Sequence, residues 1–133
     1  MIGTKSMTSK TVYIKKYDWI LRFYIIDKCS DIEAILYSIP NSQIRYKVKQ
    51  KIKRCGLNTG LTYSKGRSTI IIIGRTLSVA EFLNTLTHEL SHLAVHISEY
   101  YNIPLSSEET AYAVGDTIPL IFSAISKHLN NDR

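Results

Sequence analysis

The stretch SVAEFLNTLTHELSHLAVHISEYY, residues 78–101, is the longest part of the chain whose hydrophobic pattern fits a single helix. Its apolar residues recur at the three- and four-residue spacing of one helix face. They are Val79, Phe82, Leu83, Leu86, Leu90, Leu93, Ala94 and Ile97. Ser78 followed by Glu81 has the spacing of a capping box, and Pro104 ends the pattern. The sequence therefore predicts one long amphipathic helix over residues 78–101.

The middle of this helix contains an HExxH motif, His88-Glu89-Leu90-Ser91-His92. Residues four apart share a helix face, so the His88 and His92 imidazoles can converge on one Zn²⁺ ion. Glu89 is displaced around the helix, where its carboxylate can act as general base on a water that the metal activates. We expect His88 and His92 to be metal ligands and Glu89 to be the catalytic residue. The alternative is a pair of ordinary histidines on an amphipathic helix.

A catalytic zinc site has three protein ligands and one open position, so a third ligand is needed. His96 lies one turn beyond the pair, and one straight helix does not easily wrap three turns around a single ion. We therefore expect His96 to support the ligands or simply to pack. His128 has no motif around it and is expected at the surface. The better candidates are two acids downstream, Glu108 and Glu109.

Two arguments separate Glu108 from Glu109 as the third metal ligand. Glu109 follows Ser106 by three residues, so its carboxylate is expected to close a capping box. Glu108 stands at the head of an apolar stripe that must face the core, where a charge needs a metal or another partner. The stripe consists of Ala111, Gly115, Ile118, Phe122, Ile125 and Leu129. The alternative for Glu108 is an ordinary first-turn acid that the helix dipole favours.

The rest of the chain alternates between strand-like and helix-like patterns. We expect strands at 12–14, 19–26, 61–64 and 68–73, and helices over 31–39, 41–55, 78–101 and 106–129. The alternation of apolar and basic residues within 41–55 also fits a strand, but Asn41 as cap, Gly56 as stop and the many Lys, Gln and Arg residues favour the helix. Lys65-Gly66-Arg67 joins two of these strands as a hairpin turn. The run Ile70–Ile73 has no polar alternation, so we expect its strand to be buried on both faces; the alternative is that an extended substrate adds to it. This order gives an α+β domain over residues 11–133, after a loose leader at 1–10.

Length and composition are those of one globular domain. The chain has 133 residues, of which 44% are hydrophobic and 21% charged, and this balance excludes wholesale disorder. No apolar run reaches the roughly 18–20 residues of a membrane span, and the first residues lack the apolar region of a signal peptide. We expect a cytoplasmic protein without membrane contact. Cys29 and Cys55 form no CxxC pair, so both are expected to be reduced thiols.

Positive charge is concentrated in one block of the chain. The formal net charge is +6, and residues 45–54 contain six cations and no acid. These cations are Arg45, Lys47, Lys49, Lys51, Lys53 and Arg54. Such a block can contact nucleic acid or an acidic partner. The alternative, which the absence of an aromatic or glycine pattern favours, is the solvated face of a helix in a basic protein.

Further motifs accompany the HExxH helix. They are Gly60-Leu61-Thr62-Tyr63-Ser64, Ile73-Gly74, Ala80-Glu81-Phe82-Leu83-Asn84-Thr85, Leu93-Ala94-Val95-His96-Ile97 and Ser107-Glu108-Glu109-Thr110-Ala111-Tyr112. Together with the HExxH motif, they resemble small HExxH proteins encoded by phages and mobile elements, related to the Glu-type zincin metallopeptidases. The resemblance covers residues 56–118 and implies a minimal zincin-like core. In such a core, a small mixed or antiparallel sheet carries the HExxH helix, and a C-terminal helix packs against it.

Two functions follow from these residues. The first is a zinc-dependent, metallopeptidase-like hydrolase, in which His88, His92 and Glu108 bind Zn²⁺ and Glu89 acts as general base on the water that attacks a peptide or protein substrate. The alternative is a non-catalytic, metal-stabilised virion or interaction protein of the phage type. It would use the basic residues 45–54 to bind nucleic acid or a host protein. If the chain is phage-encoded, the expected location is the cytoplasm of the host cell.

Overall fold

The computed structural model describes residues 7–28, 30–39, 41–51, 60–74 and 76–129. Within these residues the fold is α+β, as the sequence predicts. Its strands are β1 (Met7–Ile14), β2 (Trp19–Ile26), β3 (Gly60–Lys65) and β4 (Ser68–Ile73). Its helices are α1 (Asp31–Tyr37), α2 (Ser42–Lys51), α3 (Val79–Tyr101) and α4 (Glu108–Leu129), with a short 3-10 helix, η1 (Lys15–Tyr17), between β1 and β2.

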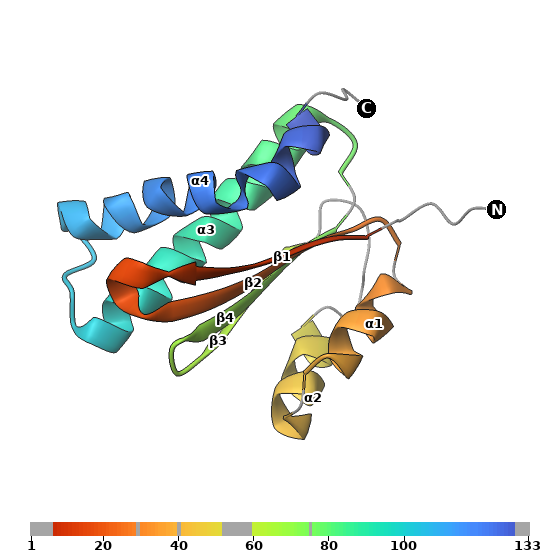
Figure 1. Ribbon diagram of the computed structural model, residues 1–133, viewed down its shortest axis with the longest axis horizontal. Helices are drawn as coiled ribbons and strands as arrows, with labels where there is room; N and C mark the ends of the chain where they lie inside the picture. Colours follow the sequence, from red (N-terminus) through yellow and green to blue (C-terminus); the bar gives the residue numbers. More distant parts are fainter. Residues whose placement is uncertain (1–6, 29, 40, 52–59, 75, 130–133) are drawn as a thin grey trace.

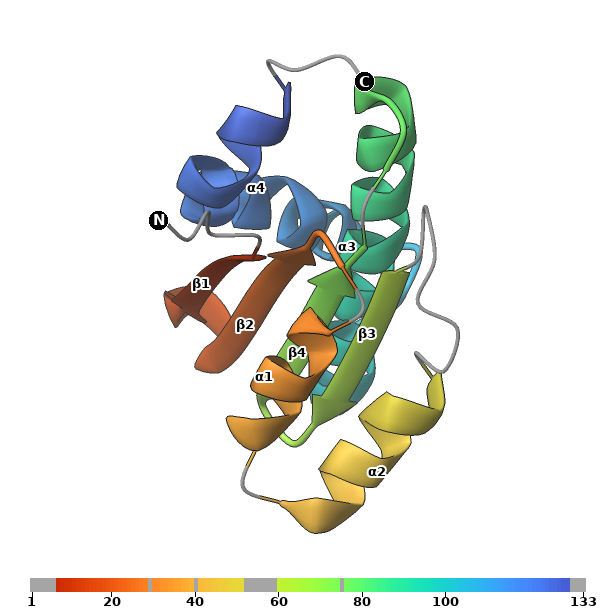
Figure 2. The same cartoon turned by 90° about the vertical axis from the view of Figure 1, so that its right-hand side faces the viewer.

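The four strands form one mixed sheet in the order β1-β2-β4-β3 (Figure 2). The outer pairs, β1 with β2 and β3 with β4, are antiparallel, and the central pair, β2 with β4, is parallel. Lys65 pairs with Ser68 across the predicted hairpin turn, where Gly66 has a φ of 60° that a glycine adopts without strain. Strand β3 is therefore an edge strand, whereas β4 has a hydrogen-bonded neighbour on both sides.

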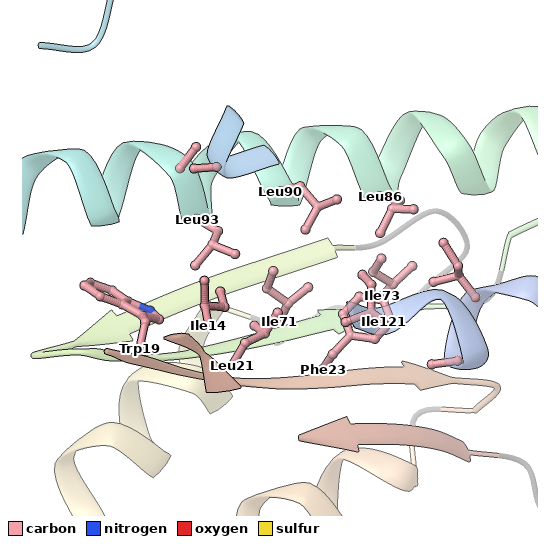
Figure 3. Packing of buried hydrophobic residues seen from close by; sticks show 14 of the residues in the cluster. Ile14, Trp19, Leu21, Phe23, Ile71, Ile73, Leu86, Leu90, Leu93 and Ile121 are labelled. Atoms are coloured by element: carbon pink, nitrogen blue, oxygen red, sulfur yellow. The ribbon is translucent and has the colours of Figure 1, made fainter. Parts of the chain in front are cut away.

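Helices cover both faces of the sheet. Helices α3 and α4 lie on one face, and α1 and α2 lie on the other (Figure 1). Alternate residues of the central strands point to the two sides: Ile71 and Ile73 join the core under α3, whereas Ile70 and Ile72 join the core under α1 and α2. Figure 3 shows the first of these cores. The prediction that Ile70–Ile73 is buried on both faces is confirmed.

A chain of polar contacts ties α3 to the sheet. The Trp19 Nε1–H donates to Thr69 Oγ1 at 2.8 Å, and Thr69 Oγ1 is 2.7 Å from Ser64 Oγ. Ser64 Oγ in turn lies 2.5 Å from His96 Nδ1. An indole N–H can only donate. All three hydrogen bonds therefore form when the Thr69 hydroxyl donates to Ser64 Oγ and the Ser64 hydroxyl donates to His96 Nδ1. His96 thus helps to join α3 to the sheet, and the expectation that it supports the metal ligands stays a prediction.

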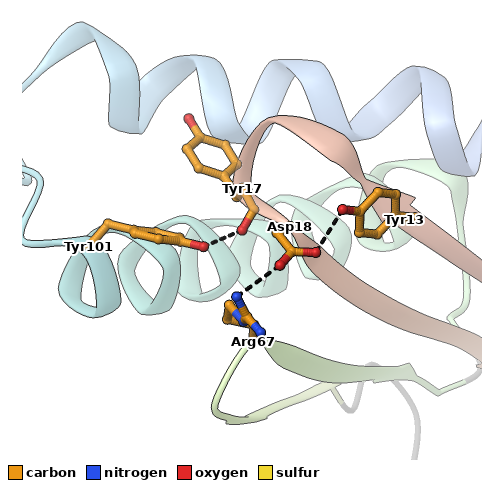
Figure 4. Close-up of polar contacts among 5 residues, drawn as sticks. All are labelled: Tyr13, Tyr17, Asp18, Arg67 and Tyr101. Carbon is orange, nitrogen blue, oxygen red and sulfur yellow. Dashed lines mark hydrogen bonds and ion pairs between the residues drawn. The ribbon is translucent and has the colours of Figure 1, made fainter.

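A second polar cluster fixes the end of α3 beside the turn between β1 and β2 (Figure 4). The Asp18 carboxylate accepts from the Tyr13 hydroxyl at 2.7 Å and pairs with Arg67 at 2.8 Å. The hydrogen bond to Asp18 raises the pKa of Tyr13 above its usual value. The Tyr101 hydroxyl donates to the backbone carbonyl of Tyr17. The hairpin turn, η1 and the last turn of α3 are therefore joined at one end of the sheet.

Several local predictions differ from the structure. Strand β1 begins at Met7, inside the expected leader, because residues 7–10 pair with β2. Helix α2 is described as far as Lys51, so the rest of the predicted helix 41–55 lies outside the described residues, as do Cys29 and Cys55. Among the helices in the described ranges, none is long and apolar enough to cross a membrane.

We predict that Thr69→Val destabilises the protein by about 1–3 kcal/mol, because a buried Trp19 N–H then lacks its acceptor. Thr69→Ser keeps the hydroxyl and is expected to lose less stability. The free energy of unfolding, measured by urea denaturation, checks this. The matched control is Thr11→Val at an exposed position of β1, which is expected to change stability by no more than about 0.5 kcal/mol. Equal effects of the two valine substitutions would contradict the assigned role of Thr69.

Candidate metal centre

The structure brings the two histidines of the HExxH motif together. The Nε2 atoms of His88 and His92 are 3.2 Å apart, and their ring centroids are 4.7 Å apart. Two imidazole ligands at about 2.0–2.1 Å from one tetrahedral ion have nitrogens about 3.3 Å apart. Both side chains are exposed to solvent. The pair therefore fits two positions of a zinc coordination sphere that solvent can reach.

Helix geometry is the reason for this convergence. Residues four apart lie on one face of a regular helix, and α3 continues without interruption from Val79 to Tyr101. Ser78 begins the helix as the sequence predicts, because its side chain accepts a hydrogen bond from the Glu81 N–H at 3.1 Å. His96 lies on the next turn, with its ring centroid 6.3 Å from that of His92 and its Nδ1 directed to Ser64. His96 is thus turned toward the sheet.

The Glu89 side chain points toward the edge strand β3. Its side chain is buried, with 5% of its surface exposed. The Thr62 hydroxyl lies 2.6 Å from Glu89 Oε1 and 3.1 Å from the Glu89 backbone oxygen. A buried carboxylate needs such a donor, since it has lost the hydrogen bonds of water. Thr62 therefore fixes the direction of the predicted catalytic carboxylate.

Gly60, the first residue of β3, makes room for that carboxylate. A Cβ atom at position 60 would lie 2.5 Å from Glu89 Oε2 and 2.9 Å from Thr85 Cγ2. Real Cβ atoms essentially never approach other atoms so closely. Gly60 and Thr62 belong to one of the sequence motifs, but the sequence does not predict their role. Their contacts with Glu89 join residues 27 or more positions apart in the chain.

The structure does not place Glu108 beside the histidine pair. Within the described ranges, no three His, Cys, Asp or Glu side chains are grouped so that they could hold a metal ion. Glu108 is the first residue of α4 and is exposed, whereas Glu109 is half-buried. The role of Glu108 as the third ligand therefore stays a prediction. His128 is half-buried and stacks on Phe82 at a centroid distance of 5.3 Å, so its predicted surface position is wrong.

The two arguments that favoured Glu108 over Glu109 are both wrong. The Thr110 N–H donates to Ser107 Oγ at 3.4 Å, so Ser107 and not Ser106 caps the helix. The predicted stripe is also displaced: Ala111, Gly115 and Phe122 are exposed. The buried residues of α4 are Ala113, Thr117, Ile121, Ala124 and Ile125. Helix α4 has small or apolar residues on several faces, so its sequence pattern does not show which face is buried. Packing against α3 and β1 determines the buried face.

The strand available to an extended partner is β3 rather than β4. Strand β4, at residues 68–73, pairs with β2 on one side and β3 on the other, so its main chain has no free edge. The suggestion that a substrate adds to this strand is therefore wrong. The outer edge of β3 has no neighbouring strand within the described part of the sheet. This edge belongs to the strand that carries Gly60 and Thr62.

Comparisons with known proteins give no match to this chain. A scan against protein-family models, a search of curated proteins and a search of solved structures each find none. The resemblance to small zincins therefore stays a prediction. The α+β class is established by the structure, and the chemistry of the site has to be inferred from its own residues.

We predict that Gly60→Ala destabilises the protein by about 1–3 kcal/mol, because the added methyl group overlaps the Glu89 carboxylate. The matched control is Gly115→Ala on the exposed side of α4, where no atom lies within 4 Å of the added Cβ. That substitution is expected to stabilise the helix by about 0.5–1 kcal/mol. Thermal or urea denaturation measures both. Two changes of the same sign and size would contradict the close approach of Gly60 to Glu89.

Proposed function

We propose that the protein is a zinc-dependent hydrolase that acts on peptide bonds, with His88 and His92 as metal ligands and Glu89 as general base. The observation that carries this proposal is the 3.2 Å separation of the two Nε2 atoms on one solvent-accessible helix face. Neutral imidazole is a preferred zinc ligand, and the HExxH spacing supplies the pair together with an adjacent carboxylate. The two imidazoles thus fit two ligand positions of a zinc ion.

The residues of the chain divide the chemical work between them. When bound, Zn²⁺ polarises a carbonyl group and lowers the pKa of water. The Glu89 carboxylate accepts a proton from the attacking water and returns it to the leaving amine. The Thr62 hydroxyl holds Glu89 Oε1 and so limits the directions that this carboxylate can take. Burial of Glu89 between α3 and β3 keeps its side chain in one position relative to the histidines.

An extended peptide is the substrate class that best fits the surroundings. Among the described residues, no strand pairs with the outer edge of β3, so its main-chain donors and acceptors are available there, and peptides bind such edges as an added strand. Thr62 of this strand contacts Glu89, so a peptide paired with β3 would run past the general base. The α+β arrangement, with α3 on a mixed sheet and α4 beside it, agrees with the minimal zincin-like core that the motifs imply. Glu108 is proposed as the third ligand only because the motifs resemble those of the Glu-type zincins, in which a downstream glutamate completes the site.

We predict about one zinc ion per chain after purification without chelators, and loss of that zinc in His88→Ala and in His92→Ala, because each removes one of the two converging nitrogens. Elemental analysis of the purified proteins measures the zinc content. The matched control is His128→Ala, which removes a histidine of α4 that stacks on Phe82 and is expected to leave the zinc content unchanged. Equal zinc content in all four proteins would exclude the metal site.

The same measurement tests the third ligand. Loss of zinc in Glu108→Ala, with zinc retained in Glu109→Ala, would support Glu108. Retention in both would mean that neither acid is required, in agreement with the exposed position of Glu108 in the structure.

We predict that Glu89→Gln retains zinc and folds normally but loses about 10²–10⁴-fold in peptide cleavage, because the amide keeps the Thr62 contact and cannot take a proton. Cleavage of a mixed-peptide library, followed by mass spectrometry, detects the activity. The control is Glu81→Gln, which changes an exposed carboxylate about two turns before Glu89 on the same helix and is expected to keep full activity. A zinc-loaded Glu89→Gln protein with undiminished activity would exclude this mechanism and leave the fold unaffected.

A further inference from the structure

A cleft of about 530 Å³ opens between α1 and α2, on the face of the sheet opposite α3. Figure 2 shows the two helices side by side in front of the sheet. Tyr37 of α1 and Tyr46 of α2 both line this cleft. They are unusually exposed for aromatic residues, at 89% and 65% of their surface. The cleft therefore presents two tyrosine rings to the solvent.

The same cleft is positively charged. Arg45 and Lys49 line it, and Glu33 is the acid among its lining residues. The Arg45 Nη1–H donates to the backbone carbonyl of Ile39 at 2.6 Å, which fixes the guanidinium group at the edge of the cleft. The α2 sequence adds further cations and contains no acid. Lys53 and Arg54, at the end of the basic block, lie outside the described residues, and so does the side chain of Lys51.

We propose that this cleft binds single-stranded nucleic acid, with bases stacked on Tyr37 and Tyr46 and phosphates held by Arg45 and Lys49. Proteins that bind single strands combine a basic groove with aromatic side chains on which bases stack. Both components are present here on neighbouring helices, within one cleft. Its volume is within the range of sites that hold ligands of nucleotide size.

The exposed rings favour a single strand over the other anionic partners of a basic surface. A duplex keeps its bases stacked on one another, so its phosphates would use the cations but its base faces would leave both tyrosines without a partner. An acidic peptide would likewise need the cations alone. The function of this cleft is independent of the proposed hydrolase, because His88 and Glu89 belong to α3 on the other face of the sheet.

The test measures binding of a fluorescein-labelled oligothymidylate of about 12 nucleotides, by fluorescence anisotropy at low salt. Tyr37→Ala and Tyr46→Ala are each expected to weaken binding by about 5- to 150-fold, whereas Tyr46→Phe keeps the ring and changes affinity by less than about twofold. The matched control is Tyr112→Ala on α4, a tyrosine exposed to a similar extent (56%) outside the cleft. It is expected to bind as the unchanged protein does.

Salt dependence tests the role of the cations. Lys49→Gln is expected to weaken binding and to reduce the slope of log affinity against log salt by about 0.7, the value for one phosphate contact on a single strand. Lys10→Gln, at an exposed position of β1, removes the same charge elsewhere and is expected to leave the slope nearly unchanged.

Three results would overturn the proposal. The first is no measurable binding of the oligothymidylate at low salt. The second is equal weakening by Tyr112→Ala and Tyr46→Ala, which would mean that the cleft has no special part in binding. The third is equally tight binding of a DNA duplex or of polyglutamate with no effect of the tyrosine substitutions, which would mean a general attraction of anions to a basic protein. Circular dichroism of each variant checks that the fold is retained.

Discussion

Burial of one face of α3 against the sheet is the constraint on which the rest of this structure depends. Leu86, Leu90 and Leu93 pack into the core formed with Leu21, Phe23 and other strand residues. Once these leucines point inward, the period of the helix decides the direction of every other side chain on it. His88 and His92 then have to face the solvent, and Glu89, one residue on from His88, has to face the neighbouring strand. The candidate site is thus a consequence of how α3 is packed.

Because Glu89 is buried, strand β3 has to provide both space and a hydrogen-bond donor for its carboxylate. A carboxylate with 5% of its surface exposed lies between a helix and an edge strand, and the contact it receives there comes from the Thr62 hydroxyl. The strand meets this demand by having no side chain at Gly60 and a short, polar one at Thr62. A larger residue at position 60 would push the helix away or expel the carboxylate. Such a buried acid contributes little to stability by itself, which agrees with a role in chemistry.

The histidine pair and the basic cleft lie on opposite sides of the sheet. The larger core lies under α3 and α4. The histidine pair, His88 and His92, lies on the solvent-exposed side of α3. Under α1 and α2 lies a smaller core, built around Ile35, Val48 and Ile72. The cations of α2 and the exposed rings of Tyr37 and Tyr46 lie on this second side. Val48 points inward, and most of the remaining α2 side chains face the solvent. The proposed metal site and the proposed nucleic-acid cleft therefore lie on opposite sides of the sheet in one small domain.

The sequence by itself determined the long helix, the convergence of His88 and His92, the hairpin and the double-sided burial of Ile70–Ile73. All of these depend on residues close together in the chain, for which the periods of helix and strand fix the directions of side chains. Tertiary packing alone decided the face of α4, the position of Glu108 relative to α3 and the contacts of Glu89 with Gly60 and Thr62. Helix α4 has small or apolar residues on more than one face, so only its docking on α3 and β1 could select one. The Glu89 contacts join positions far apart in sequence, and no local period carries that information.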